Sequence, residues 1–122
     1  MQIGDLTPFE RERVDKYLVL DEDLLFSLIP QHLPEYEGTY FSPDGQRDAG
    51  RRWFEAIRGS LEQKVCHEWR MCRRIGDPEF ADATTLVLVI GDAVSTKVAG
   101  VPPVLVAAII VRMGVRRFCR CP

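Results

Sequence analysis

A row of large apolar side chains spaced four residues apart is the feature that most constrains how this chain folds. The row consists of Trp53, Ile57, Leu61, Val65 and Trp69. Residues four positions apart lie on the same face of an α-helix, so the row forms one broad apolar stripe, while arginine and glutamate fill the opposite face. The spacing therefore predicts a long amphipathic helix whose stripe packs on the core of a helical domain.

The size of the domain limits where this helix can begin and end. From Asp44 to an expected stop at Gly76, a straight helix would be about 46 Å long, at 1.5 Å per residue. A compact domain of this size is only about 35 Å across. We therefore expect the helix to begin near Asp48, or to bend near Gly50 or Gly59.

Start and stop signals divide the front of the chain into two shorter helices. Thr7 and Pro8 suit the cap and the first position of a helix that continues to Leu20. Asp21 can cap a second helix, which ends where proline begins to interrupt the chain. The stretch over 30–45 is rich in proline and glycine and is predicted to be a loop, whose aromatic side chains we expect to pack on the core.

The last third of the chain is strongly apolar. Apolar residues three and four apart predict a helix over 77–99, although β-branched residues make a strand over 84–90 the competing interpretation. Pro102 and Pro103 open the final helix, and the run Val104–Val111 is apolar on all sides, which is typical of a buried helix. The predicted fold is thus all-α, a compact bundle of about five helices with the last helix central and apolar.

Composition agrees with one independently folded unit. The chain has 122 residues, of which 46% are hydrophobic and 28% charged, so we expect a single helical domain over residues 1–122. Residues 1–5 do not resemble a signal peptide, and the longest uncharged stretch, 98–111, is too short for a bilayer, which needs roughly 20 apolar residues. The sequence therefore predicts a soluble cytoplasmic protein with no membrane association.

The four cysteines allow two interpretations. In a reducing cytoplasm they should be thiols or metal ligands rather than disulfides. Cys66 and Cys72 are six residues apart, which places them about 240° apart around one continuous helix, so they should pack separately as small core residues. Cys119 and Cys121 would then be free thiols. The alternative is a zinc site made by the four cysteines, or by three of them with His67.

Charge is unevenly distributed along the chain. Residues 1–45 contain ten acids and three bases, whereas residues 80–122 contain two acids and five bases, although the net charge is only −2. We expect the acidic front and the basic tail to neutralise each other, within one molecule or between subunits. The alternative is that the basic end binds nucleic acid or an acidic partner.

No catalytic, phosphate-binding or dinucleotide-binding motif is recognisable, and His32 and His67 are interpreted as surface residues. We therefore expect a non-catalytic interaction or adaptor module without a cofactor, acting through a protein partner or self-association. The pattern suggests contact residues Val104, Leu105, Ile109 and Arg116 on the last helix, with Asp21, Glu22 and Asp23 as a complementary acidic end. Two alternatives remain: a nucleic-acid- or nucleotide-binding regulator using the arginine-rich third helix and basic C-terminus, and a zinc-stabilised helical domain.

Overall fold

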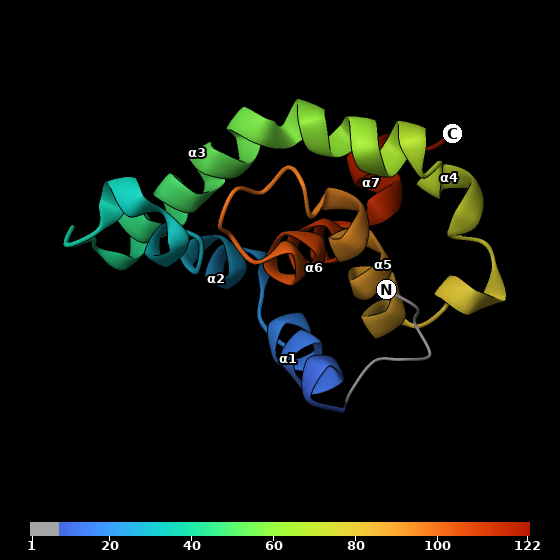
Figure 1. Ribbon diagram of the computed structural model, residues 1–122, viewed down its shortest axis with the longest axis horizontal. Helices are drawn as coiled ribbons and strands as arrows, with labels where there is room; N and C mark the ends of the chain where they lie inside the picture. The colour runs from blue at the N-terminus through green and yellow to red at the C-terminus, as the bar shows by residue number, and fades with distance from the viewer. Residues whose placement is uncertain (1–7) are drawn as a thin grey trace.

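The computed structural model describes residues 8–122, and every regular element in this range is helical (Figure 1). The α-helices are α1 (Pro8–Leu18), α2 (Glu22–Ser27), α3 (Pro43–Glu62), α4 (Met71–Arg74), α5 (Ala83–Val94), α6 (Pro103–Met113) and α7 (Val115–Cys119). Three short 3-10 segments lie at Pro30–His32, Pro34–Tyr36 and Pro78–Phe80, and a π-helical turn spans Gln63–Glu68. The predicted all-α fold is confirmed, with more helices than expected because the third and the last are each divided.

The long helix begins earlier than predicted. Ser42 caps α3, because its hydroxyl oxygen accepts a hydrogen bond from the backbone N–H of Gly45 at 3.1 Å, and Pro43 occupies the first helical position. The expected start near Asp48 is therefore wrong. Thr7, the expected cap of the first helix, lies outside the described residues.

The conflict between helix length and domain size is resolved at the other end of α3. The π-helical turn follows Glu62, and Arg70 then adopts a left-handed conformation with φ 51°. This turns the chain before α4, so the helix ends well ahead of Gly76, which lies beyond α4. The break also changes the direction of every side chain that follows it.

The helix α6 is the centre of the domain, as predicted. Residues 105–110 are fully buried, and α1, α2, α5 and α7 all pack against this helix. Gly114, with φ 98°, ends α6 and starts α7 in a different direction. No helix within residues 8–122 is long and apolar enough to cross a membrane.

The region for which a strand was the competing interpretation is helical. The carboxylate of Asp82 caps α5 by accepting a hydrogen bond from the backbone N–H of Thr85 at 3.2 Å. The apolar residues spaced three and four apart, including Val87, Ile90 and Val94, are fully buried. Burial on a helix face thus prevails over the β propensity of individual residues.

Candidate interaction surfaces

The four cysteines form two disulfides, Cys66–Cys119 and Cys72–Cys121. The prediction of thiols is therefore wrong for this structure. The 240° separation assumed one continuous helix, but the turn at Arg70 separates the two positions into different elements. Both can then reach the C-terminal segment, and the bridges fasten α7 and the residues after it to the π-helical turn and α4.

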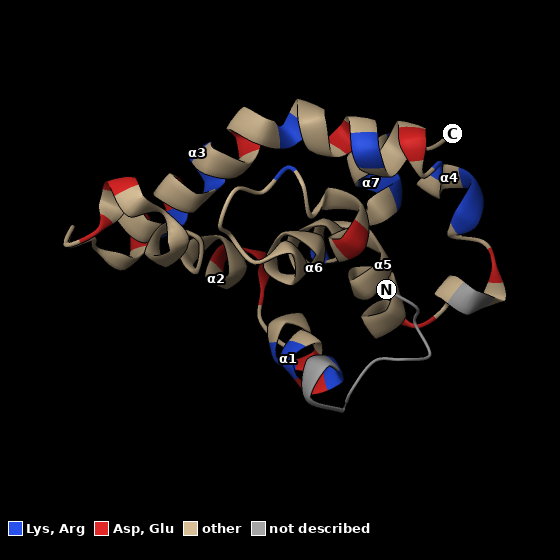
Figure 2. Ribbon diagram, viewed as in Figure 1, with Lys and Arg blue, Asp and Glu red and all other residues tan. Residues whose placement is uncertain are grey.

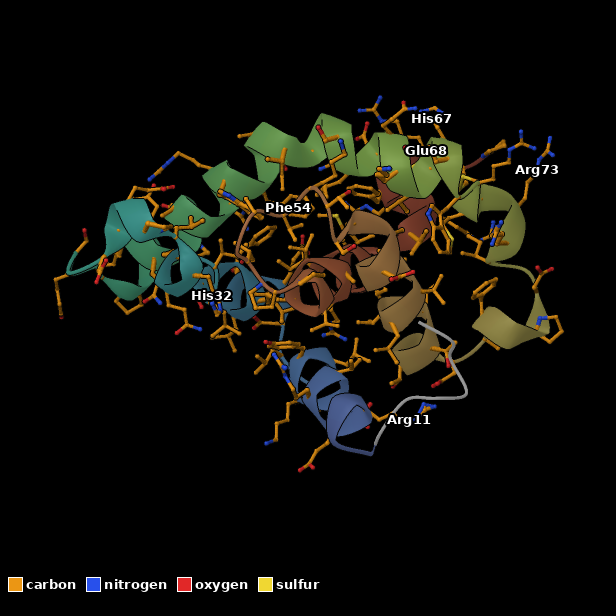
Figure 3. All side chains as sticks on the ribbon, viewed as in Figure 1. Arg11, His32, Phe54, His67, Glu68 and Arg73 are labelled. Atoms are coloured by element: carbon orange, nitrogen blue, oxygen red, sulfur yellow. A yellow bond between two sulfur atoms is a disulfide. The ribbon has the colours of Figure 1, made fainter. Side chains whose placement is uncertain are left out.

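The disulfides also bear on the zinc interpretation. Each sulfur is bonded to another sulfur, so none is a thiolate that could bind a metal ion. Within the described part of the chain, no group of three or more His, Cys, Asp or Glu residues is arranged to hold a metal. His67 is exposed on the π-helical turn and takes no part in either disulfide (Figure 3).

Six exposed arginines gather where α4 and α7 pack together, and we call this surface the arginine end. Its members are Arg70, Arg73, Arg74, Arg116, Arg117 and Arg120. Figure 2 shows the basic residues of α4 and α7 at one end of the molecule, and Figure 3 shows Arg73 pointing away from the core. Among the residues that the structure describes, none of the six forms an ion pair.

Few acids lie in the segments that carry the arginine end. Residues 66–77 and 115–122 include only Glu68 and Asp77. The carboxylate of Glu68 is already paired with Lys64 at 3.3 Å. Arg74 stacks over the ring of Trp69, 5.6 Å from its centroid, which holds one guanidinium in place without neutralising it. The surface therefore keeps a strong positive charge.

A groove at the other end of α3 has the opposite character, and we call it the acidic groove. It is lined by Asp21, Asp23, Leu24, Tyr40 and Asp44, together with neighbouring residues of α2, α3 and the loop between them. Tyr40 is 94% exposed and Leu24 is 51% exposed, and the only other large exposed hydrophobic residue in the described chain is Val19. The groove thus combines carboxylates with an uncovered aromatic ring and an uncovered leucine.

Part of the acidic charge is met by arginines of α3 rather than by the basic tail. Arg51 pairs with Asp23 at 2.9 Å, and Arg47 pairs with Asp44 at 3.5 Å. A hydrogen bond to Asp48, strengthened by that carboxylate's charge, raises the pKa of Arg47. Among the described residues, no carboxylate of residues 1–45 pairs with a base of residues 80–122, and Asp23 and Asp44 pair with arginines of α3 instead.

Distance explains why the two ends do not meet. The 20 residues of α3 separate them, and a helix of that length spans about 30 Å. Screening in physiological salt reduces interactions between exposed charges beyond about 8 Å. Each surface therefore presents its charge to the surroundings independently of the other.

The predicted contact residues have different positions in the structure. Leu105 and Ile109 are 0% exposed, so they belong to the core and cannot form a contact surface; this correction follows from the central position of α6. Val104 and Glu22 are half-buried, while Arg116 is exposed. Asp21 is exposed and caps α2, and Asp23 is also exposed. Arg116 lies in the arginine end, and Asp21 and Asp23 lie in the acidic groove.

Tyr40 is exposed, although the sequence predicts that the aromatic residues of its loop pack on the core. Tyr36 and Phe41 pack against each other, with ring centroids 5.2 Å apart, and Tyr36 also contacts the core. Tyr40 instead projects into solvent beside Asp44. The sequence pattern could place three aromatic residues in a loop but could not show which one faces outward.

A second hollow lies between α1, α5 and the start of α6, and includes Arg13, Asp92 and Val104. His32 lies in the 3-10 segment after α2 (Figure 3). Partial burial, together with the positive charge of Arg13, lowers the pKa of His32. His32 does not line the hollow, whose walls combine the charged residues Arg13 and Asp92 with apolar residues such as Val104.

No protein-family model, no curated protein and no solved structure matches this chain.

Proposed function

We propose that this protein is a small, non-catalytic helical interaction module that acts through a protein partner or through its own oligomer. In that role it would regulate or recruit an effector on another chain. The observation that carries the proposal is the pair of unlike charged surfaces, the arginine end and the acidic groove, at opposite ends of α3. Neither surface is neutralised by the other within one molecule.

The composition of both surfaces supports this proposal. Arginine and tyrosine are enriched at the centres of protein interfaces, because each buries a large, fairly rigid area and keeps polar groups for hydrogen bonding. The exposed ring of Tyr40 beside carboxylates, and the exposed guanidinium groups of α4 and α7, have this character. An isolated monomer gains nothing in stability from leaving Tyr40 94% exposed.

Binding of nucleic acid or a nucleotide is the second candidate function. The six residues of the arginine end favour it, since none of them forms an ion pair with a described residue. The arginine-rich third helix contributes less than expected from the sequence, because Arg47, Arg51 and Arg58 are paired with acids. Phosphate binding would therefore use α4 and α7. It should weaken steeply as salt rises, because each neutralised phosphate releases counterions.

The sequence predicts a cytoplasmic location, whereas the two disulfides favour an oxidising compartment. Glutathione and thioredoxin keep most cytoplasmic thiols reduced. Rapid alkylation of thiols in intact cells, followed by mass spectrometry, distinguishes a cytoplasmic location from an oxidising compartment. Cytoplasmic protein should carry four alkyl groups, one on each cysteine, whereas protein from an oxidising compartment should carry none.

Sedimentation velocity over a range of protein and salt concentrations, combined with pull-down from cell extract, tests the proposed function. We expect self-association or specific capture of a protein at low salt. A chain that stays monomeric at high protein concentration and low salt, and that captures no protein, would contradict the proposal. Titration with single- and double-stranded DNA in the same buffers tests the second candidate.

A further inference from the structure

We infer that the acidic groove of one molecule receives the arginine end of a second molecule, so that copies associate head to tail. This inference depends on the proposed function and names the partner as a second copy of this chain. The two surfaces carry opposite charges and are therefore complementary. One molecule cannot bring its own two surfaces together, because α3 lies between them.

The acidic groove has the groups that bind a guanidinium. Asp21 and Asp44 are exposed carboxylates in its lining. Arg47 also lines the groove and pairs with Asp44 at 3.5 Å, but a carboxylate can accept further hydrogen bonds, and planar guanidinium groups form paired hydrogen bonds with carboxylates. The ring of Tyr40 offers a face on which a second guanidinium can stack. Leu24 can contact the methylene groups of an arginine side chain, which are apolar.

The arginine end has the positive charge to occupy such a groove. Arg116 and Arg117 project from the short helix α7, and the bridges Cys66–Cys119 and Cys72–Cys121 hold that helix against its neighbours. Fixing the helix lowers the entropy lost when its side chains are ordered at an interface. The positive surface is therefore a preorganised one.

The positions of the two surfaces determine the geometry of association. They are different surfaces at opposite ends of α3, so the contact between copies is heterologous. A single contact of that kind leaves one groove and one arginine end free, so it continues into a chain or closes into a ring. The smallest ring is a two-fold dimer of antiparallel copies, in which each arginine end enters the other copy's groove.

The acidic groove also favours a second copy over nucleic acid as the partner. A nucleic acid would bind the arginine end alone, because Asp21, Asp23 and Asp44 repel phosphates from the groove itself. It would leave Tyr40 and Leu24 exposed. A second copy covers these residues and satisfies both charged surfaces at once.

Two double variants test this inference, and each replaces two side chains of one of the two surfaces. The groove variant is Tyr40→Ala/Asp44→Asn, and the end variant is Arg116→Gln/Arg117→Gln. We expect each to weaken self-association at least about tenfold in sedimentation velocity, since truncating central aromatic and arginine side chains commonly has this effect. An equimolar mixture should form a 1:1 complex and nothing larger, because only one intact groove and one intact arginine end remain.

Controls separate a specific contact from a general effect of charge. Glu12→Gln on α1 and Lys97→Gln after α5 change exposed charges away from both surfaces and should leave self-association unchanged. Thermal melts of all variants identify any loss of folding, and complex formation in the mixture shows that both double variants retain a functional surface.

The possible outcomes distinguish this inference from the proposed function. Oligomers that persist in both double variants would overturn the head-to-tail arrangement and leave the interaction module intact. A wild-type chain that is monomeric but captures another protein would overturn only the inference that the partner is a second copy. Salt-dependent DNA binding by a monomeric wild type, abolished in the end variant, would overturn the inference in favour of nucleic acid.

Discussion

Gly50 of α3 lies so close to Phe26 of α2 that a Cβ added to the glycine would be 1.9 Å from the Phe26 carbonyl oxygen. The carbonyl oxygen of Phe26 belongs to the backbone, so no change of side-chain rotamer can relieve the clash. Replacing Gly50 by alanine should therefore separate the two helices. The same two helices contribute residues to the walls of the acidic groove.

We expect Gly50→Ala to lower the free energy of unfolding by about 1–3 kcal/mol or more, the usual cost of overpacking. The matched control is Gly59→Ala in the same helix, where the added Cβ would meet nothing within 4 Å. That change should raise stability by about 0.5–1 kcal/mol, since alanine loses less backbone entropy than glycine. Urea unfolding of both variants measures the difference, and equal effects would contradict the close approach.

The disulfides should make a large contribution to stability. Cys66–Cys119 spans a sequence separation of 53 residues, for which the loop-entropy model gives about 4 kcal/mol. The separation for Cys72–Cys121 is 49 residues, but this bridge adjoins the first and adds less once that loop is closed. We expect Cys66→Ser/Cys119→Ser to lose less than half of the stability lost by the variant lacking all four cysteines, because Cys72–Cys121 still closes nearly the same loop. Denaturant unfolding measures both losses.

Mass spectrometry of the unreduced protein checks the bridges directly. With two disulfides the chain should be four hydrogen atoms lighter than the fully reduced chain. Native spectra should also lack added zinc. A chain at the reduced mass with one bound zinc ion would instead favour the zinc-stabilised domain, and chelation should then lower its melting temperature.

The stability of the fold should fall as the pH drops below the ordinary pKa of histidine, 6.5. Partial burial, and then the charge of Arg13, lower the pKa of His32 in the folded state, so the unfolded chain binds a proton first. Protonation thus favours unfolding between pH 6.5 and the lower folded pKa, and stability rises with pH in that window. His32→Gln should reduce the slope of unfolding free energy against pH, as measured by urea unfolding at several pH values.

The cap of α5 offers a further local test. Asp82→Ala removes the acceptor for the N–H and the hydroxyl of Thr85, at 3.2 and 3.0 Å, and should cost about 1 kcal/mol. Asp82→Asn retains an acceptor and should cost less. The same hydrogen bonds lower the pKa of Asp82, so its stabilisation should be lost as the pH falls below 3.8. Asp92→Ala, on an exposed face of the same helix, is the control and should change little.

The amino-acid sequence was sufficient to predict the helical segments and the buried position of α6. The evidence for these is local: the spacing of apolar residues, a capping aspartate such as Asp82, and the proline pair that opens α6. Such signals act over one or two helical turns, so they hold wherever the rest of the chain lies. The helix over 84–90, which the three-and-four spacing favours over a strand, is confirmed.

The tertiary structure alone decided which surfaces these helices expose. The pairing of Cys66 with Cys119, the exposure of Tyr40 and the grouping of six arginines depend on the turn at Arg70 and on how α7 packs. Residues brought together in this way are about 50 positions apart in the chain. No local periodicity encodes such contacts, because they depend on the path of the whole backbone and on packing across the shared core.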